Sequence, residues 1–275
     1  MKGTLYIVAT PIGNLEDITL RALRILKEVD IIAAEDTRHT LQLLNHFKIS
    51  KPLISYYKQI EEERSSAILE KLESGQNVAL VSDAGTPGIS DPGEVIIKKA
   101  IERKINVVPV PGACAAINAL ICSGIKTDEF CFMGFLPANI TEKKRKLEAN
   151  KDEVKTLIFY EAPHKLIKTL EVMQEILGDR KISLCKELTK IHENFERDRI
   201  SSILEKIDDP KGEYVIIVEG ADKSKQEQET ETLNNMTLDE HFLYYEKKGL
   251  DKKEIIKRIA KDRGVSKNVI YQKFI

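Results

Sequence analysis

The sequence predicts an α/β protein of two successive domains, with a small helical segment at its C-terminal end. Three observations lead to this prediction. Continuous apolar runs alternate with helical patterns through the first 120 residues, and a shorter alternation of the same kind begins at residue 124. After residue 219 the composition turns almost entirely polar before a last helical pattern. Apolar strands that alternate with helices are typical of a parallel sheet covered on both faces.

The first predicted domain, residues 1–123, contains five strand-like runs, at residues 4–10, 30–36, 52–57, 77–83 and 106–111. Helical patterns separate them. In residues 20–29 the apolar side chains recur on one helical face, and residues 59–74 form a more charged helix that Gly75 closes as a cap.

The second predicted domain, residues 124–220, repeats this organisation on a smaller scale. Residues 131–136 are predicted to be a strand or a linker. Strands are predicted at residues 156–162, 181–188 and 213–219, and helices at 141–151 and 164–177. In the strand 181–188, Lys186 and Leu188 should share one face while Glu187 points to the other, because side chains alternate along a strand.

Two further parts follow. Residues 221–235 are predicted to be an acidic flexible linker, and residues 236–275 a basic helical segment with ten Lys and Arg against six acidic residues. In that segment, a helix at 251–263, a turn at 264–266 and a helix at 267–274 match the spacing of a helix-turn-helix. Its role stays open between contact with nucleic acid, a packing subdomain and a dimer contact.

Composition and missing motifs exclude several classes of function. The net charge is −1, from 43 basic and 44 acidic residues, so the chain is not a uniformly basic coat for nucleic acid. It contains no dinucleotide fingerprint after the first strand, Walker A loop, HExxH or GxSxG motif. Its histidines lack ligand spacing and its four cysteines form no CxxC pair, so we expect no metal, reduced thiols and a cytoplasmic location without a membrane span.

Three loops rich in glycine and proline follow strands of the first domain, at residues 11–14, 83–93 and 111–116. Open α/β sheets place ligands at the carboxyl ends of their strands. Glycine and proline give these loops fixed backbone paths with little side-chain bulk, so a flat ligand can lie against the main chain.

These loops also carry a family resemblance. The segments LYIVATPIGNLEDIT, SDAGTPGISDPG and PGACAAINAL resemble the tetrapyrrole methylase superfamily of S-adenosylmethionine-dependent methyltransferases. The motifs AEDTRHT (34–40), FMGFLP (132–137), FYEAPHK (159–165) and KELTK (186–190) are similar to the branch that methylates a ribose 2′-hydroxyl of a decoding-region cytidine in 16S ribosomal RNA. The resemblance covers residues 3–220.

The resemblance implies the two-domain fold of class III methyltransferases, S-adenosylmethionine as cofactor, a homodimer, and 16S rRNA in the small ribosomal subunit as partner. It also implies a donor pocket that involves Pro11, Ile12, Gly85, Thr86, Pro87, Ile89, Pro111, Cys114, Ala115, Tyr160 and Leu188. The first two loops depart from those of porphyrin-modifying relatives, because they read PIGN and GTP, and this favours the RNA branch.

Methyl transfer to a ribose hydroxyl needs in-line alignment and is helped by a group that accepts the proton. Our hypothesis is that Glu187 or Lys186 is this acceptor, with Asp36 and Glu161 as alternatives. A structural ion-pair network of Glu35, Asp36 and Arg38 is the competing interpretation of the first motif.

Contact with RNA phosphates requires Lys and Arg. The candidates are Arg38, Lys143, Lys144, Arg145, Lys146 and Lys190. A solvated helix face is the competing interpretation of the run 143–146. Two other functions compete with rRNA methylation: a tetrapyrrole or diphthine-type methyltransferase on the same scaffold, and a non-catalytic helix-turn-helix regulator that binds DNA.

Overall fold

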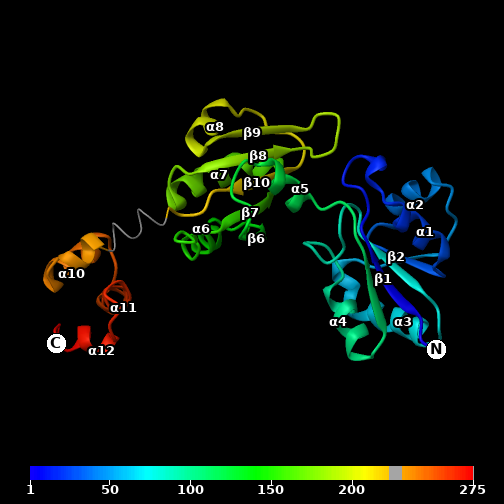
Figure 1. Cartoon of the computed structure of the whole chain (residues 1–275), viewed down its shortest axis with the longest axis horizontal. Helices are drawn as coiled ribbons and strands as arrows, with labels where there is room; N and C mark the ends of the chain where they lie inside the picture. The colour runs from blue at the N-terminus through cyan, green and yellow to red at the C-terminus, as the bar shows by residue number, and fades with distance from the viewer. Residues whose placement is uncertain (223–230, 275) are drawn as a thin grey trace. The chain divides into compact units, whose positions relative to one another are not determined.

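The computed structural model describes residues 1–222 and 231–274, which belong to two compact units. The larger unit comprises residues 1–148 and 155–219, and the smaller unit comprises residues 149–154 and the described residues from 220 onward. The larger unit contains two five-stranded sheets (Figure 1).

The first sheet is parallel throughout, in the order β3-β2-β4-β1-β5. Its strands are β1 (Thr4–Val8), β2 (Ile31–Ala34), β3 (Leu53–Ser55), β4 (Val78–Val81) and β5 (Asn106–Val110), one within each of the five predicted runs. Every residue of β2 and β4 is buried. These strands are continuous apolar runs because both faces of the sheet are covered, as predicted from the sequence.

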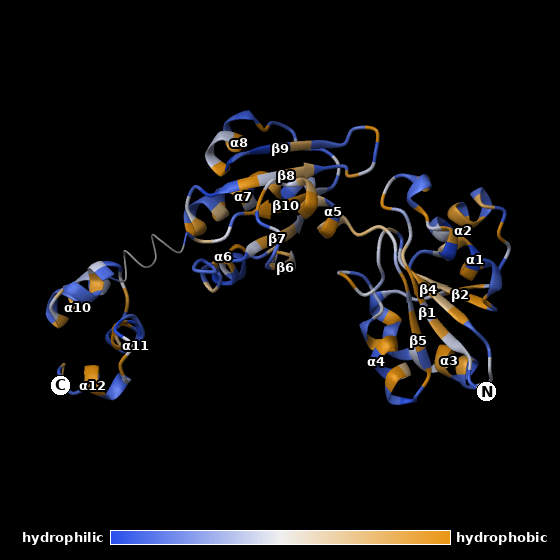
Figure 2. Ribbon diagram, in the orientation of Figure 1, coloured by the Kyte–Doolittle hydropathy of each residue, from blue (hydrophilic) through white to orange (hydrophobic). Residues whose placement is uncertain are grey.

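Helices cover the first sheet on both faces. They are α1 (Leu20–Glu28), α2 (Thr37–His46), α3 (Glu61–Glu73) and α4 (Glu94–Glu102). The helices α1 and α2 contribute to one hydrophobic cluster and α3 and α4 to another. Figure 2 shows hydrophobic residues along the inner strands β1 and β4, between these layers.

The second sheet has the order β6-β7-β10-β8-β9. Its strands are β6 (Phe130–Phe135), β7 (Thr156–Glu161), β8 (Lys181–Lys186), β9 (Asn194–Arg199) and β10 (Tyr214–Val218). The strands β6 and β7 are parallel, whereas β10 runs antiparallel to both β7 and β8. The hydrophilic edge strand β9 (Figure 2) was not predicted, because an edge strand can pair through its backbone without an apolar face.

The second sheet is also covered on two faces. Its helices are α6 (Ile140–Glu148), α7 (Pro163–Leu177) and α8 (Ile200–Lys206). The opposite face packs on α5 (Ala115–Cys122), whose Ala116, Ala119 and Leu120 share a cluster with residues of β7, β8 and β10. The chain between β5 and α5 therefore joins the first sheet to the helix that covers the second.

The smaller unit contains α10 (Leu238–Lys247), α11 (Lys252–Asp262) and α12 (Lys267–Tyr271). The turn predicted at 264–266 separates α11 and α12. Of the predicted linker, residues 223–230 lie outside the described residues. The linker prediction is wrong for residues 231–235, which are helical, because Leu233 is buried in the hydrophobic core of this unit. Within the described residues, no helix is long and apolar enough to cross a membrane.

Candidate functional site

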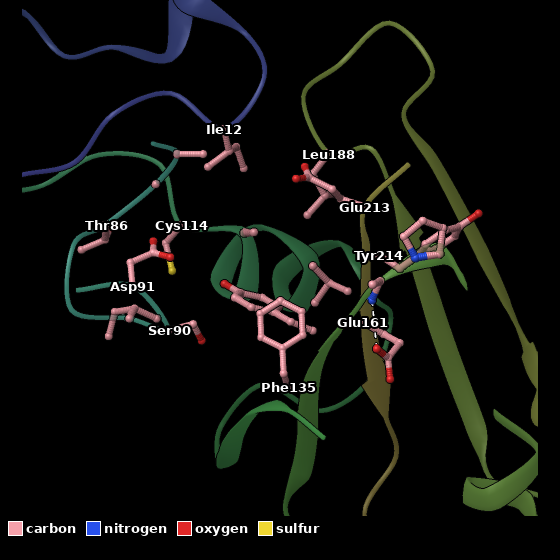
Figure 3. A pocket seen from close by; sticks show the side chains of 18 of the residues that line it. Ile12, Thr86, Ser90, Asp91, Cys114, Phe135, Glu161, Leu188, Glu213 and Tyr214 are labelled. Atoms are coloured by element: carbon pink, nitrogen blue, oxygen red, sulfur yellow. Dashed lines mark hydrogen bonds between the residues drawn. The ribbon is translucent and has the colours of Figure 1, made fainter. Parts of the chain in front are cut away.

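A cavity of roughly 500 Å³ opens in the larger unit between the loops of the first sheet and the end of the second. This volume is typical of sites that enclose a small molecule. Figure 3 shows Thr86, Asp91 and Cys114 on one side, Leu188, Glu213 and Glu161 on the other, and Phe135 between them. The lining residues are Ile12, Ala84, Gly85, Thr86, Ile89, Ser90, Asp91, Cys114, Ala115, Phe135, Tyr160, Glu161, Ala162, Pro163, His164, Leu188, Glu213, Tyr214 and Val215.

Short hydrogen bonds connect the three predicted loops. Thr10, which directly precedes the first loop, and Gly85 of the second loop exchange two backbone hydrogen bonds, at 2.8 and 3.1 Å. The second and third are joined because the Thr86 hydroxyl donates to the Ala113 carbonyl at 3.0 Å. Gly85 has a φ of +82°, and a Cβ placed there would lie 3.3 Å from Cγ2 of Ile12. The loops thus form one fixed surface on this side of the cavity.

Aromatic side chains build part of the opposite wall. Tyr160, near the end of β7, accepts a hydrogen bond from the backbone N–H of Ala116 at 3.1 Å, which places its ring beside the start of α5. Burial raises the pKa of Tyr160 to about 12, so its hydroxyl stays protonated at neutral pH. The rings of Phe132 and Phe135 meet it edge-on, with centroids 5.1 and 5.6 Å away.

Most residues predicted for the donor pocket line this cavity. They are Ile12, Gly85, Thr86, Ile89, Cys114, Ala115, Tyr160 and Leu188. Pro11, Pro87 and Pro111 are not among the lining residues, although they belong to the same loops. Residues 213–215 were not predicted to line the cavity, because ligands in open α/β sheets are expected at the carboxyl ends of strands. Since β10 is antiparallel to its neighbours, its first residues lie beside the last residues of β7 and β8.

Asp36 does not line the cavity. Its carboxylate caps α2 by accepting the backbone N–H of Arg38 at 2.8 Å, and it forms an ion pair with the Arg38 guanidinium at 2.7 Å. These hydrogen bonds hold the pKa of Asp36 down to about 2, which makes it a weak proton acceptor. The geometry favours the structural interpretation of this motif.

The strand predicted at residues 181–188 is two residues shorter in the structure. The strand β8 ends at Lys186, and Glu187 adopts a left-handed conformation with a φ of +49°. The carboxylate of Glu187 accepts the backbone N–H of Glu213 at 2.8 Å and the ammonium of Lys190 at 3.0 Å. Burial opposes ionisation of Glu187, but these hydrogen bonds outweigh it and lower its pKa. Leu188 faces the cavity, whereas Glu187 does not.

Lys186 and Glu161 are the other two candidate proton acceptors. Lys186 lines a separate, polar pocket together with His192, Lys206 and other residues, rather than the large cavity. Glu161 does line the large cavity. Its carboxylate, however, already accepts hydrogen bonds from the Ala162 N–H at 2.9 Å and from the Thr169 hydroxyl at 2.6 Å.

The prediction that Lys143 contacts RNA is wrong, because its side chain is only 4% exposed. Its ammonium donates to the Thr169 hydroxyl at 2.5 Å. The other three members of the run differ in their contacts. Lys144 forms an ion pair with Glu175, and Lys146 donates a hydrogen bond to the Met133 carbonyl. Arg145 is exposed. Of the remaining RNA candidates, Arg38 is bound to Asp36, and Lys190 to Glu187 and Glu213.

Residues 4–204 match the family model described as Tetrapyrrole (Corrin/Porphyrin) Methylases. The chain belongs to this family. It is 48% identical to "Ribosomal RNA small subunit methyltransferase I" of Bacillus subtilis, over 99% of this chain and 94% of the relative. The protein of the same name from Haemophilus influenzae is also 48% identical, over 99% of this chain and 96% of that one.

Two solved structures share the fold. Diphthine synthase superposes with a TM-score of 0.63 at 18% identity and covers 79% of this chain and 90% of its own. Uroporphyrin-III C-methyl transferase from Thermus thermophilus, complexed with S-adenyl homocysteine, superposes with a TM-score of 0.56 at 19% identity. The match covers 78% of this chain and 97% of that one. The predicted class III fold is confirmed, and membership of an enzyme family removes the non-catalytic regulator from the candidates.

The methyl donor of this tetrapyrrole methylase is S-adenosylmethionine, and the cavity fits it. Apolar side chains such as Ile12, Leu188 and Val215 suit the adenosine, and Gly85 leaves the backbone open to close approach. The carboxylate of Glu213 suits a ligand that carries a sulfonium and an ammonium group.

Proposed function

We propose that this protein transfers a methyl group from S-adenosylmethionine to the ribose 2′-hydroxyl of a cytidine in the decoding region of 16S rRNA. One observation carries the proposal: the similarity to ribosomal RNA small subunit methyltransferases I extends over 99% of the chain, at 48% identity. By contrast, the solved diphthine synthase and uroporphyrin-III methyltransferase are only 18–19% identical to this chain and match 78–79% of its length.

The residues around the cavity support this reaction by fixing geometry. The bound donor supplies a methyl carbon on a sulfonium, which an oxygen nucleophile can attack in line with the departing sulfur. The linked loops at Thr10, Gly85 and Thr86 hold one wall, and Tyr160 anchored on Ala116 holds the other. Because such alignment lowers the barrier by several kcal/mol, roughly 7–11 in well-oriented systems, a rigid pocket contributes strongly to the rate.

We further propose that the protein acts in the cytoplasm on the small ribosomal subunit, as a homodimer. Large apolar side chains of α5 and of the edge strand β6 are exposed, namely Ile117, Ile121, Phe130 and Phe132. A second copy that covered them would remove apolar surface from water. Sedimentation analysis should give the mass of a dimer, and Phe130→Glu with Phe132→Glu should shift it to a monomer.

The test of the reaction offers several substrates in parallel. The protein is incubated with methyl-labelled donor and small subunits that lack the modification, naked 16S rRNA, a precorrin, or a protein that carries the modified histidine on which a diphthine-type methyltransferase would act. We expect label on one cytidine, at a position where alkaline hydrolysis no longer cleaves the chain. Label in the macrocycle or in the protein substrate would replace the proposal with one of the competing functions.

A further inference from the structure

Asp91 places a carboxylate in the donor cavity from the loop between β4 and α4 (Figure 3). The loop around it is tightly specified. Ser90 has a φ of +69°, which is unusual for a residue with a side chain, and Gly93, the N-cap of α4, has a φ of +151°. The backbone N–H of Gly93 donates to the Glu61 carboxylate at 2.8 Å. The position of Asp91 is therefore fixed from both sides.

The surroundings of Asp91 differ from those of the acidic residues discussed above. Asp36 and Glu187 each form an ion pair, and so does Glu161, whereas Asp91 forms none within the part of the chain that the structure describes. Burial, and then the nearby carboxylate of Glu35, raise the pKa of Asp91 to about 6, although a hydrogen bond from Ser82 opposes this.

Charged and titratable groups face Asp91 from each neighbouring element. Glu35 follows β2, Asp83 follows β4, Tyr160 lies on β7, and Cys114 precedes α5. The two carboxylates add repulsion, and Tyr160 is neutral at physiological pH because its pKa is raised to about 12. Asp91 is thus more basic than an ordinary aspartate and still largely ionised above neutral pH.

We infer that Asp91 is the group that accepts the proton of the ribose 2′-hydroxyl during methyl transfer. The inference rests on the proposed function. In the step, the O–H bond breaks while a bond forms between the oxygen and the methyl carbon. The carbon–sulfur bond breaks, and its electron pair stays on sulfur, which becomes a neutral thioether. The proton moves to the carboxylate of Asp91, so the charges balance.

Replacement of the carboxylate should slow transfer without loss of binding. For Asp91→Asn, we expect the single-turnover rate on small subunits at pH 7.5 to fall by about 10²- to 10⁴-fold, the range typical of a lost general base. Donor affinity by calorimetry and affinity for small subunits should each stay within about threefold. The matched control is Asp198→Asn on the exposed edge strand β9, which should keep the wild-type rate.

Two readouts identify the carboxylate as the base. The wild-type rate should rise with pH and level off above an apparent pKa of about 6, and this rise should disappear in Asp91→Asn. Carbon-13 NMR of labelled aspartate in the donor-free protein should show one carboxyl that titrates near the same pH and is missing from the variant.

Each other outcome has a definite meaning. A variant rate within threefold of a normal wild-type rate overturns the assignment of Asp91 alone. A fall in rate matched by an equal fall in donor affinity also overturns it, because the carboxylate would then hold the donor. Absence of ribose label with the wild-type protein overturns the proposed function, and this assignment with it.

Discussion

The ammonium of Lys143 lies 3.6 Å from the carboxylate of Glu161, and both side chains are almost fully excluded from solvent. The hydroxyl of Thr169 joins them, because it accepts from Lys143 at 2.5 Å and donates to Glu161 at 2.6 Å. Glu161 also lines the donor cavity and accepts the Ala162 N–H. A buried network thus ties α6 and α7 to the wall of the site.

Removal of Lys143 should destabilise the larger unit strongly. Lys143→Met leaves the Glu161 carboxylate buried without its charge partner, and changes of this kind cost about 3–5 kcal/mol. Urea unfolding followed by circular dichroism measures the loss. The control is Arg145→Met on the same helix, where the side chain is exposed and we expect a change within about 0.5 kcal/mol. Equal stability of the two variants would contradict the role of the network.

A side chain at Gly85 should weaken donor binding. Gly85→Ala forces a left-handed conformation on a residue with a Cβ, at a cost of roughly 1–2 kcal/mol, and brings that atom 3.3 Å from Ile12. Since binding must restore the strained loop, we expect the donor Kd to rise about 5- to 30-fold in calorimetry. The control is Gly178→Ala, because Gly178 has a similar φ of +79° but does not line the cavity. This variant should lower stability while donor affinity stays normal.

Tyr160→Phe should loosen the start of α5. The variant keeps the ring but leaves the Ala116 N–H without its acceptor, which costs about 1–3 kcal/mol for a buried donor. Both stability and donor affinity should fall, as measured by thermal unfolding and calorimetry. Tyr57→Phe, at an exposed position, should change neither. An unchanged donor Kd in Tyr160→Phe would show that this hydrogen bond does not shape the cavity.

The carboxylate of Asp91 should lower stability at neutral pH. Its pKa is raised in the folded protein from 3.8 to about 6, so the folded state binds the proton more tightly than the unfolded state does. The associated stabilisation is complete below pH 4 and is lost as the pH rises through about 6. Asp91→Asn should therefore be more stable than the wild type at pH 8 and equal to it near pH 3.5. Parallel curves of stability against pH would refute this.

Arg145 is the member of the basic run that remains available for phosphate contact. A plot of log affinity for small subunits against log salt has a negative slope. We expect Arg145→Ala to make this slope less steep by about one, because one fewer counterion is released. Arg24→Ala on α1, whose arginine pairs with Glu28 at the surface, should leave the slope unchanged. The same slope in both variants would remove this helix from the RNA interface.

The sequence predicted the first sheet well because its strands are buried on both faces and read as continuous apolar runs. It did not reveal β9, whose residues are mostly charged. Nor did it reveal the burial of Lys143, because the partner that compensates the charge, Glu161, lies on another element, β7, and only the fold brings the two side chains together. Asp91 stands in a recognisable loop together with Asp83, but only the fold brings it near Glu35.

The packing of α5 on the second sheet determines where this chain can be divided. A fragment that ended at residue 123 would take α5 with it and leave apolar residues of β7, β8 and β10 bare, namely Ile158, Cys185, Val215 and Ile217. Such a C-terminal half should aggregate when produced alone. Co-expressed halves should reassemble better when the break falls before residue 114, because the second half then keeps the helix that shields its sheet.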